Sequence, residues 1–598
     1  MDSTSHTLSS NKEAFIEFEQ ISAYCRTNWG ENVERHQIEQ LAEISLLPLF
    51  VSDERRFVLK NDLVSLHSVL SRKSDLDITG FLSNRLFEQG LEVSPNCHLE
   101  MSGGFEQLDP AFYSAARNLL STANQLETFG PIHTLSYFPP TLISTCSPAI
   151  VEYVKQQKRR AQIVGIGDIN DFAGTAHYMG SKRLLSGFLV EALSPYVPTE
   201  GVIVDLMCGS GAASRAFSQT WRTIACDLQE FCTILAAIQG GGFSSNKAQQ
   251  VLQKLLPIAR GHARDLTAIL SRFVREEDGI LHSDAGPSLL TKYRRFLDYF
   301  PTYPHDDSVD NWHPKSEVEK RKRNPKEYPY CLFSSYFANV FFGIRQCIEI
   351  DSLRFAIDQL QDEDERTWSL GALITTASAL GTTYGAHFAQ PKIGNVEKLD
   401  VLGLSRIIEQ RAYSIVHEFT MRLMNLADES GNKQRRIETF KGPWQATLST
   451  VDELLGNQPT LVYVDAPYKR DEYSRYYHLL ETLVSYSYPQ SLGKGRLPEK
   501  GTRERPASEF FTRSQHSINK AFVSVISSIL ERRWTCAWSY ASSGNADMVD
   551  VLSTIQSLYS CEITSYATPY EHKAQGKAKA AKRVTEYLVV ITPGSKLS

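Results

Sequence analysis

Apolar and polar positions follow two different periods in the second part of the chain, and this pattern predicts a sheet flanked by helices. Residues 202–207 form a mainly apolar run that ends in a glycine-containing segment, 208–211. A helical pattern follows over 213–217, and a second apolar run over 221–226 ends at Asp227. The order of buried strand, glycine loop, helix, strand and acidic residue is typical of the opening of a doubly wound nucleotide-binding sheet.

Further strands are expected much later in the chain. Residues 461–464 are apolar and largely β-branched, and 535–538 and 587–591 have a similar character. Helix-rich runs dominate the stretch between these strands and the first two, notably around 333–425. We therefore expect an α/β fold, in which a doubly wound sheet is divided by a long, mostly helical insert.

The N-terminal region follows a different pattern. From Lys12 to about Arg72, apolar residues recur at three- and four-residue spacing, as in amphipathic helices. Residues 55–59 could form a short strand. An accessory helical region is expected here, and a winged-helix-like module is the alternative. The apolar positions of this pattern are Phe15, Ile16, Phe18, Ile21, Ile38, Leu41 and Ile44.

These patterns divide the chain into four expected parts. Residues 1–165 form a separate helical accessory region, and 166–240 form the first part of the sheet. Residues 241–455 form the insert, and 456–598 form the second part of the sheet.

Composition places the chain among globular proteins with more than one core. A chain of 598 residues is too long for one core, and 42% hydrophobic and 22% charged residues are ordinary values. No apolar run approaches a membrane span and the N-terminus does not resemble a signal peptide, so we expect a soluble, cytoplasmic protein without a membrane partner. The ten cysteines are scattered, which predicts reduced thiols and no metal site. The net charge is −5, so any grip on phosphates must be local.

The loop between the first two strands is a candidate cofactor site. Gly209 and Gly211 form a G-x-G turn between strand and helix, and Asp227 closes the next strand. An acid at this place can accept hydrogen bonds from both hydroxyl groups of a ribose. The third glycine of the dinucleotide fingerprint is missing, which favours a smaller adenosine cofactor such as S-adenosyl-L-methionine.

A second candidate site follows the strand at 461–464. Asp465, Ala466, Pro467 and Tyr468 offer one carboxylate, backbone carbonyls held near a proline, and one flat ring. The amino group of adenine is a poor nucleophile, because its lone pair is delocalised into the ring. Two acceptors, the Asp465 carboxylate and a carbonyl of Ala466 or Pro467, would favour attack on a sulfonium methyl group, while Tyr468 stacks on the base. The alternative interpretation of this segment is an ordinary turn at the end of a strand, without a catalytic role.

A third segment lies just before the first strand. Tyr178 and Lys182 belong to a Tyr-x-Gly-Ser-Lys sequence that precedes an amphipathic helix. These side chains could meet the carboxylate and the face of a methyl donor. Taken alone, the segment is better explained as a helix N-terminus with a solvated basic end.

The order of the three segments resembles that of the α-class, Dam-like adenine DNA methyltransferases, particularly their larger-insert members from restriction-modification systems. In this family the elements are motif X (Tyr178 to Lys182), motif I (Asp205 to Gly211), motif II (Asp227) and motif IV (Asp465 to Tyr468). Residues 471–481 resemble motif V, and 574–590 resemble the family's closing basic loop and strand. The resemblance covers about 170–595 and leaves the N-terminal region without a role. The family usually has proline where this chain has Ala466; only backbone rigidity depends on that ring.

The resemblance implies a fold, a reaction and a set of site residues. The fold is an S-adenosylmethionine-dependent methyltransferase sheet, with the target-recognition region in the insert. The reaction is methyl transfer from S-adenosyl-L-methionine to the N6 amino group of adenine in a specific duplex DNA sequence, by base flipping. Asp465, Ala466, Pro467 and Tyr468 would be catalytic. The donor would be bound by Tyr178, Lys182, Asp205, Gly209, Gly211, Asp227 and Asp465.

Double-stranded DNA is thus the expected partner, and a restriction or defence-system partner is compatible with the resemblance. Two basic segments, 493–513 and 573–583, are candidates for gripping phosphates, although solvated surface charge would explain either one. Methylation of the cytosine amino group or of RNA is the alternative within this chemistry. A DNA-binding component whose methylase fold has lost turnover is the alternative outside it.

Overall fold

The computed structural model describes the chain in segments. These are residues 15–29, 49–52, 55–59, 98–100, 132–134, 182–281, 287–299, 320, 323–324, 326–383, 387–391, 401–430, 437–467, 472–489, 491–493, 496–541, 544–572 and 582–594. Tyr178 and Tyr468, two of the expected site residues, lie outside these segments, as do Ile38, Leu41 and Ile44 of the expected N-terminal helices.

An eight-stranded sheet forms the centre of the protein, with the strand order β5-β11-β12-β10-β9-β6-β7-β8. Strand β12 is antiparallel to both neighbours, and the other five pairings are parallel. From β8 to β10 the order is that of a doubly wound sheet, which reverses direction between β6 and β9. The strands are β5 (Ile132–Thr134), β6 (Val202–Asp205), β7 (Arg222–Asp227), β8 (Ile437–Lys441), β9 (Thr460–Val464), β10 (Thr535–Ala541), β11 (Cys561–His572) and β12 (Lys582–Pro593). The expected α/β class is confirmed at this level.

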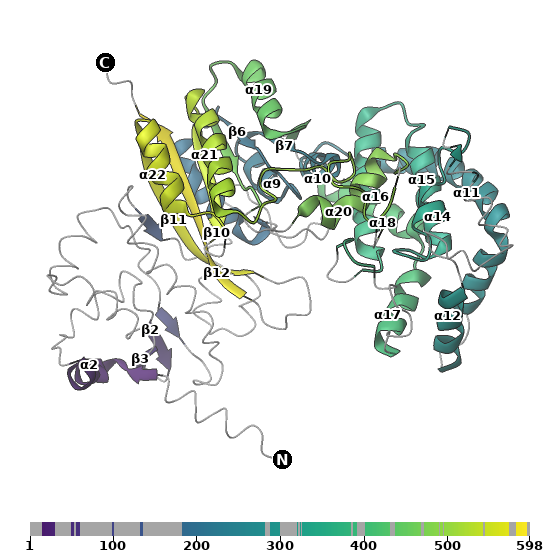
Figure 1. The fold of residues 1–598 in the computed structure, drawn as a ribbon, viewed down its shortest axis with the longest axis horizontal. Coiled ribbons are helices and arrows are strands. Elements are labelled where there is room, and N and C mark those ends of the chain that lie inside the picture. The colour runs from purple at the N-terminus through teal and green to yellow at the C-terminus, as the bar shows by residue number, and fades with distance from the viewer. Residues whose placement is uncertain are drawn as a thin grey trace, which may run out of the picture.

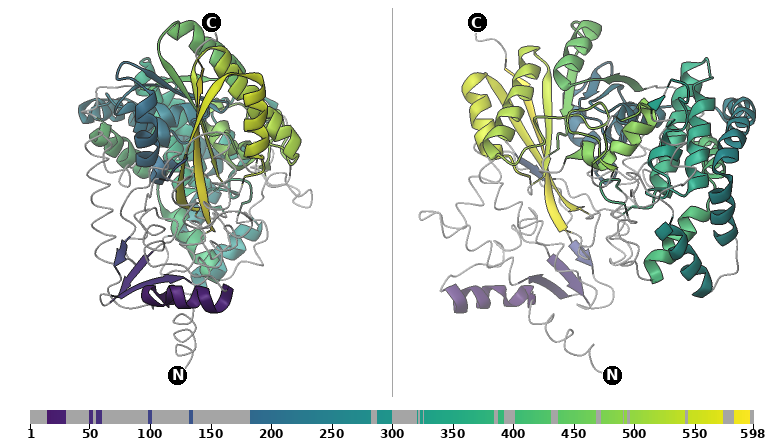
Figure 2. Two further views of the ribbon diagram at one scale, coloured as in Figure 1. Left: turned by 90° about the vertical axis from the view of Figure 1, so that its left-hand side faces the viewer. Right: turned by 45° about the vertical axis from the view of Figure 1, so that its right-hand side comes forward.

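Helices cover both faces of the sheet, which explains why its central strands read as continuous apolar runs. Val202 and Val204 pack on one side with α19 (Trp444–Leu455), α21 (Gln515–Glu531) and α22 (Met548–Leu558). Ile203 packs on the other side with α8 (Ser186–Leu193) and α9 (Ala212–Ser218). Figure 1 and Figure 2 show the sheet between these helices. Successive side chains of β6 therefore serve two separate cores.

The insert forms a helical body beside the sheet (Figure 1). Its helices are α11 (Ser245–Leu281), α12 (Pro287–Tyr299), α14 (Leu332–Tyr336), α15 (Ile344–Ile357), α16 (Glu363–Leu380), α17 (Val401–Ala412) and α18 (Ile415–Ser430). Two helices from the sheet side, α10 (Glu230–Gln239) and α20 (Tyr473–Ser485), share its hydrophobic core. The mostly helical insert is thus confirmed in the described residues.

The expected end of the insert at residue 455 is wrong, because β8 and α19 belong to the sheet. Strand β8 has the sequence Ile-Glu-Thr-Phe-Lys and lies at the sheet edge, where Ile437 is buried, the next three residues are half-buried and Lys441 is exposed. Such a short and polar edge strand has little hydrophobic periodicity, so the sequence pattern did not predict it as a strand.

The N-terminal region contains more strand than expected. Strands β1 (Phe15–Glu17), β2 (Leu49–Ser52), β3 (Arg55–Leu59) and β4 (His98–Glu100) form a second sheet in the order β1-β3-β2-β4. The strand at 55–59 is confirmed, and helix α2 (Ile21–Trp29) accounts for part of the helical pattern. The helix expected over Phe15 and Ile16 is wrong, because both residues pair with β3.

This region is also not separate from the rest of the protein. Strand β5 pairs in parallel with β11, so a segment far upstream of the glycine loop extends the main sheet. None of the helices in the described residues has the length and apolar character needed to cross a membrane.

A buried ion pair ties the helical body together. Arg411 of α17 donates from Nη1 to Asn339 Oδ1 over 2.6 Å and to the Tyr293 hydroxyl over 2.9 Å. The same nitrogen lies 3.8 Å from Glu277 Oε1 on α11, and both charged side chains are fully buried. Glu277 also accepts a hydrogen bond from the backbone N–H of Ile344 at the start of α15.

We expect Arg411→Met to lower the free energy of unfolding by about 3–5 kcal/mol, because it leaves the Glu277 carboxylate buried without its cation. Arg422→Met is the matched control, since Arg422 pairs with Glu418 nearer the surface of α18; it should cost about 1 kcal/mol or less. Denaturant unfolding measures both variants. Equal losses in the two would contradict the importance given to the buried pair.

Candidate functional site

Three acidic residues meet at one edge of the sheet. Asp205 ends β6, Asp227 ends β7, and Asp465 directly follows β9. Because these strands are parallel neighbours, their carboxyl ends lie at the same edge. The strand order reverses between β6 and β9, and ligands of doubly wound sheets bind at this switch point. A cavity at this edge is lined by all three side chains.

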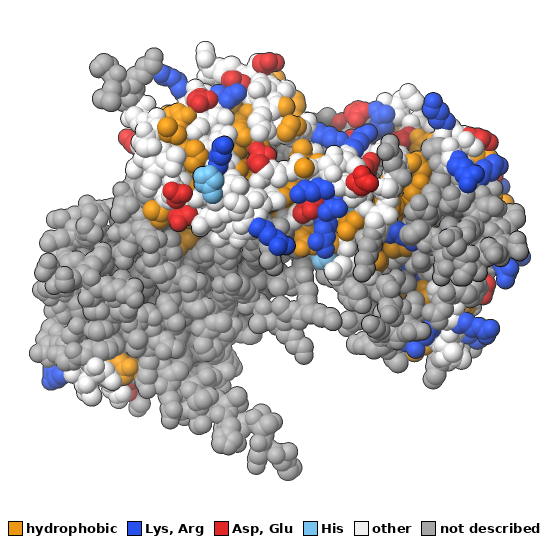
Figure 3. Space-filling model, in the orientation of Figure 1, with side chains coloured by type: hydrophobic (Ala, Val, Ile, Leu, Met, Phe, Trp, Pro, Cys, Tyr) orange, Lys and Arg blue, Asp and Glu red, His pale blue; other side chains and the backbone are white. Residues whose placement is uncertain are grey.

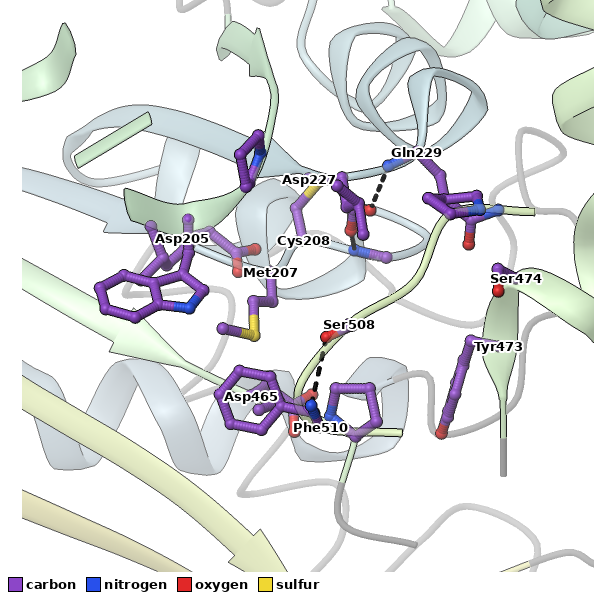
Figure 4. Close-up of a pocket in the computed structure, with 18 of the residues that line it drawn as sticks. Asp205, Met207, Cys208, Asp227, Gln229, Asp465, Tyr473, Ser474, Ser508 and Phe510 are labelled. Atoms are coloured by element: carbon purple, nitrogen blue, oxygen red, sulfur yellow. Dashed lines mark hydrogen bonds between the residues drawn. The ribbon is translucent and has the colours of Figure 1, made fainter. Parts of the chain in front are cut away.

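The loop after β6 wraps around the carboxylate of Asp227. The backbone N–H of Gly209 donates to Asp227 Oδ2 over 3.0 Å, and that of Gln229 donates to Oδ1 over 2.9 Å. Figure 4 shows Asp227 and Gln229 side by side on the cavity wall. Gly209 has a φ of 50°, a left-handed conformation that glycine adopts without strain. The loop is therefore shaped by the acid that the sequence singles out.

Gly211 has a different role from the one expected. It does not line the cavity, and a Cβ atom there would lie 2.6 Å from the Cα of Ala236 on α10. Its φ of 74° is also left-handed. Gly211 thus lets the loop pack closely against α10, and a larger side chain would disturb that packing without entering the space of a ligand.

Lys182 lines the cavity and lies between two carboxylates. Its Nζ lies 3.0 Å from Asp465 Oδ1 and 2.8 Å from Glu586 Oε1. Ser539 Oγ donates to the same Glu586 oxygen over 2.7 Å. The structure therefore brings Lys182 together with the expected catalytic carboxylate and not to a solvated helix end.

The segment after Asp465 continues along the cavity. Ala466 is fully buried, and both Ala466 and Pro467 line the cavity. Tyr473 and Ser474 at the start of α20 complete this side, as Figure 4 shows. The described part of the expected catalytic loop thus faces the same space as the glycine loop.

Residues 506–511, part of the basic segment 493–513, form a roof over the cavity that the sequence did not predict. Pro506 to Phe511 line the cavity opposite the glycine loop, and Glu509 Oε1 accepts a hydrogen bond from Trp444 Nε1 over 2.6 Å. Trp444, Met207 and Phe510 add apolar surface to the wall. No local pattern marks these residues as site residues, because their segments meet the site only through the fold.

Burial disfavours charge on the three cavity acids that end the parallel strands. It raises the pKa of Asp205 to about 7, against a hydrogen bond from Ser214 and with support from the nearby Asp465 and Asp227 carboxylates. It raises the pKa of Asp227 to about 6, although backbone N–H groups oppose the change. It also raises the pKa of Asp465 to about 6, against the attraction of Lys182.

Several buried polar atoms of the cavity wall have no hydrogen-bond partner among the described residues. Among them are Oδ1 of Asp205, an acceptor, and Nε2 of Gln229, a donor. A buried polar atom without a partner is costly, and a polar ligand would remove that cost. Gln229 was not among the expected site residues; its place two residues after Asp227 is the only signal the sequence offers.

Some of the basic side chains that were expected to bind phosphates already form ion pairs within the protein. Arg505 donates to both carboxylate oxygens of Glu472, over 2.7 and 3.0 Å, and Arg503 lies 3.3 Å from Glu230. Lys500 and Arg513 are exposed. Figure 3 shows Lys and Arg side chains, with some acids among them, on the face between the sheet and the helical body. The segment 573–581 lies outside the described residues.

We expect Asp205→Asn to make the ligand-free protein more stable at pH 8 than the parent. Because the pKa of Asp205 is raised to about 7, stability from its neutral form is fully present below about pH 4 and is lost as the pH rises through about 7. Asparagine stays neutral and can still accept from Ser214. The advantage should grow between pH 5 and pH 7 by on the order of 1.4 kcal/mol per unit. Denaturant unfolding at several pH values measures it, and parallel pH curves would contradict it.

Comparison with known proteins does not name this site. A search with protein-family models finds no match to the chain, and no curated protein matches it. What the cavity can do therefore follows from the residues that form it.

Proposed function

We propose that this protein transfers a methyl group from S-adenosyl-L-methionine to the N6 amino group of adenine in a specific sequence of duplex DNA. One observation carries the proposal. The glycine loop with Asp227 and the Asp465-Ala466-Pro467 segment, separated by the whole insert, line one cavity at the switch point of a doubly wound sheet. A donor site and an acceptor for a target amino group thus adjoin each other.

The cavity fits the proposed donor in polarity and charge. Asp227 is placed to accept from ribose hydroxyls, and the amide of Gln229 and Oδ1 of Asp205 have unused hydrogen-bonding capacity. When bound, the donor supplies an electrophilic methyl group on a positively charged sulfur. Four acids against one lysine make the cavity wall favourable for such a cation.

Asp465 is the proposed acceptor for the target amino group. Lys182 contacts Oδ1, which leaves the second carboxylate oxygen for a ligand. The carbonyl of Ala466 or Pro467 would serve as the second acceptor, and such fixed acceptors stabilise developing positive charge on the attacking nitrogen. This role requires the ionised carboxylate, so activity should fall as Asp465 takes up a proton at about pH 6.

The target base must leave the duplex to reach this cavity, because its amino group is otherwise paired and stacked. Tyr468 would stack on the extruded base. Sequence recognition is assigned to the helical body, now bounded at residue 430, which is joined to the sheet side through α10 and α20. A restriction or defence-system partner and a cytoplasmic location stay predictions.

The decisive experiment incubates the purified chain with labelled S-adenosyl-L-methionine and genomic DNA, then identifies the modified base. Labelled N6-methyladenine in one sequence context supports the proposal. N4-methylcytosine, or labelling of RNA alone, would replace the substrate. Donor binding without transfer to any nucleic acid would identify a binding component with a methylase-like fold.

We expect Asp465→Ala to reduce single-turnover methylation by at least about a thousandfold, because its contact with the amino group strengthens in the transition state. Donor affinity should stay within the same order of magnitude. Asp452→Ala is the matched control, because Asp452 lies on α19 and pairs at the surface with Arg532. Normal transfer at saturating donor by the Asp465 variant would contradict the assignment.

We expect Asp227→Ala to raise the dissociation constant of S-adenosyl-L-methionine roughly ten- to a hundredfold. The change removes acceptors for the ribose and also frees the N–H groups of Gly209 and Gln229 that shape the loop. Calorimetric titration with the donor measures the effect. An unchanged dissociation constant would place the donor elsewhere.

A further inference from the structure

Four polar side chains from four elements meet at the cavity wall and just behind it. Lys182 comes from the segment before α8, Asp465 follows β9, Ser539 lies on β10, and Glu586 lies on β12. Lys182 and Glu586 are almost or completely buried, with exposed side-chain fractions of 4% and 0%. The Lys182 ammonium group lies within ion-pair distance of both carboxylates, and Ser539 holds the Glu586 carboxylate.

Sheet register explains how Glu586 reaches this place. In the parallel pairing of β10 with β9, Trp538 lies opposite Val464, so Ser539 is level with Asp465. In the antiparallel pairing of β10 with β12, Ala541 lies opposite Glu586. Strand β12 runs against the other central strands, and its early residues therefore lie at the same edge as the ends of β9 and β10.

We propose that Glu586 is a positioning residue for the Asp465 carboxylate and acts on it through Lys182. This inference rests on the proposed function of Asp465. Glu586 lines no part of the cavity, so it is not placed to touch substrate or donor. Its carboxylate and that of Asp465 share one ammonium group, which fixes the direction from which Lys182 approaches Asp465 Oδ1.

The second carboxylate has an electrostatic consequence. If Asp465 were the only partner, Lys182 would neutralise it fully and weaken it as an acceptor for the target amino group. Two carboxylates on one ammonium group carry a net negative charge, so Asp465 remains a strong acceptor while its orientation is fixed. The arrangement explains why a buried acid is tolerated outside the cavity.

Other charged or titratable groups near Asp465 also influence its pKa. Asp205 on β6 interacts with it electrostatically, and so does the buried phenol of Tyr463 on β9. Lys182 lowers the pKa of Asp465, whereas Glu586 raises it. Replacing Glu586 by a neutral isostere therefore lowers the pKa of Asp465, while Asp205 and Tyr463 stay in place.

The test compares pH profiles of single-turnover methylation for the parent and Glu586→Gln, at saturating donor and DNA. The parent should lose activity as the pH falls through about 6. In the variant this acidic limb of the pH profile, where activity falls with pH, should shift to lower pH by roughly one unit. One nearby charge typically has an effect of this size. The plateau rate should fall as well, because Lys182 loses its second anchor.

Glu438→Gln is the matched control, since Glu438 lies on β8 of the same sheet and pairs with Arg222 away from Asp465. It removes the same charge and should leave the limb in place. A lower plateau without a shifted limb would mean that Glu586 only supports the fold, and would overturn the proposal. Ser539→Ala is a milder second variant, which releases Glu586 without removing it and should move the limb in either direction by a measurable amount.

A readout without catalysis separates this inference from the proposed function. Denaturant unfolding of Asp465→Asn, Glu586→Gln and the double variant gives the coupling between the two carboxylates. We expect an unfavourable coupling at pH 8 that diminishes at pH 5, where Asp465 is protonated. Coupling without any methyl transfer by the parent would retain the charge arrangement and reject the function. Zero coupling at both pH values would reject the inference, whatever the parent does to DNA.

Discussion

The parallel pairing of β6 with both β7 and β9 is the constraint on which the candidate site depends. Each strand delivers an acid at its carboxyl end, and parallel register places Asp205, Asp227 and Asp465 at one edge of the sheet. Helices on both faces make this possible, because they bury the apolar strands on either side. The chain between β7 and β9 is long enough to form a whole helical body, yet the two strands still flank β6.

Placing several acids at one edge has an electrostatic cost that shapes the cavity. Burial raises the pKa of Asp205, Asp227 and Asp465, and one lysine offsets part of their charge. Backbone N–H groups stabilise Asp227, whereas Asp465 depends on Lys182. The acids are thus held by different means, in keeping with different proposed roles: a fixed acceptor for a ribose and a reactive acceptor for an amino group.

The connection between the two bodies runs through helices next to the site. Helix α10 follows Asp227 closely and α20 follows the Asp465 segment, and both bury apolar side chains in the helical body. Arg505, near the roof, pairs with Glu472 just before α20. Movement of the helical body would therefore reach both the Asp227 side and the Asp465 side of the cavity by direct packing.

The sequence by itself determined the local features of this protein. Each of these features is encoded within a few neighbouring residues, so periodicity and turn chemistry predict it from the sequence. They are the apolar runs of β6, β7, β9, β10 and β12, the glycine turn and the acids at strand ends. Only the tertiary structure decided which distant residues meet. It brought Glu586 to Lys182, placed Phe510 over the cavity, turned Gly211 toward α10 and added β5, β8 and β11 to the sheet. Several of these contacts join segments far apart in the chain, and short or half-polar strands gain their stability from pairing and burial and not from a local pattern.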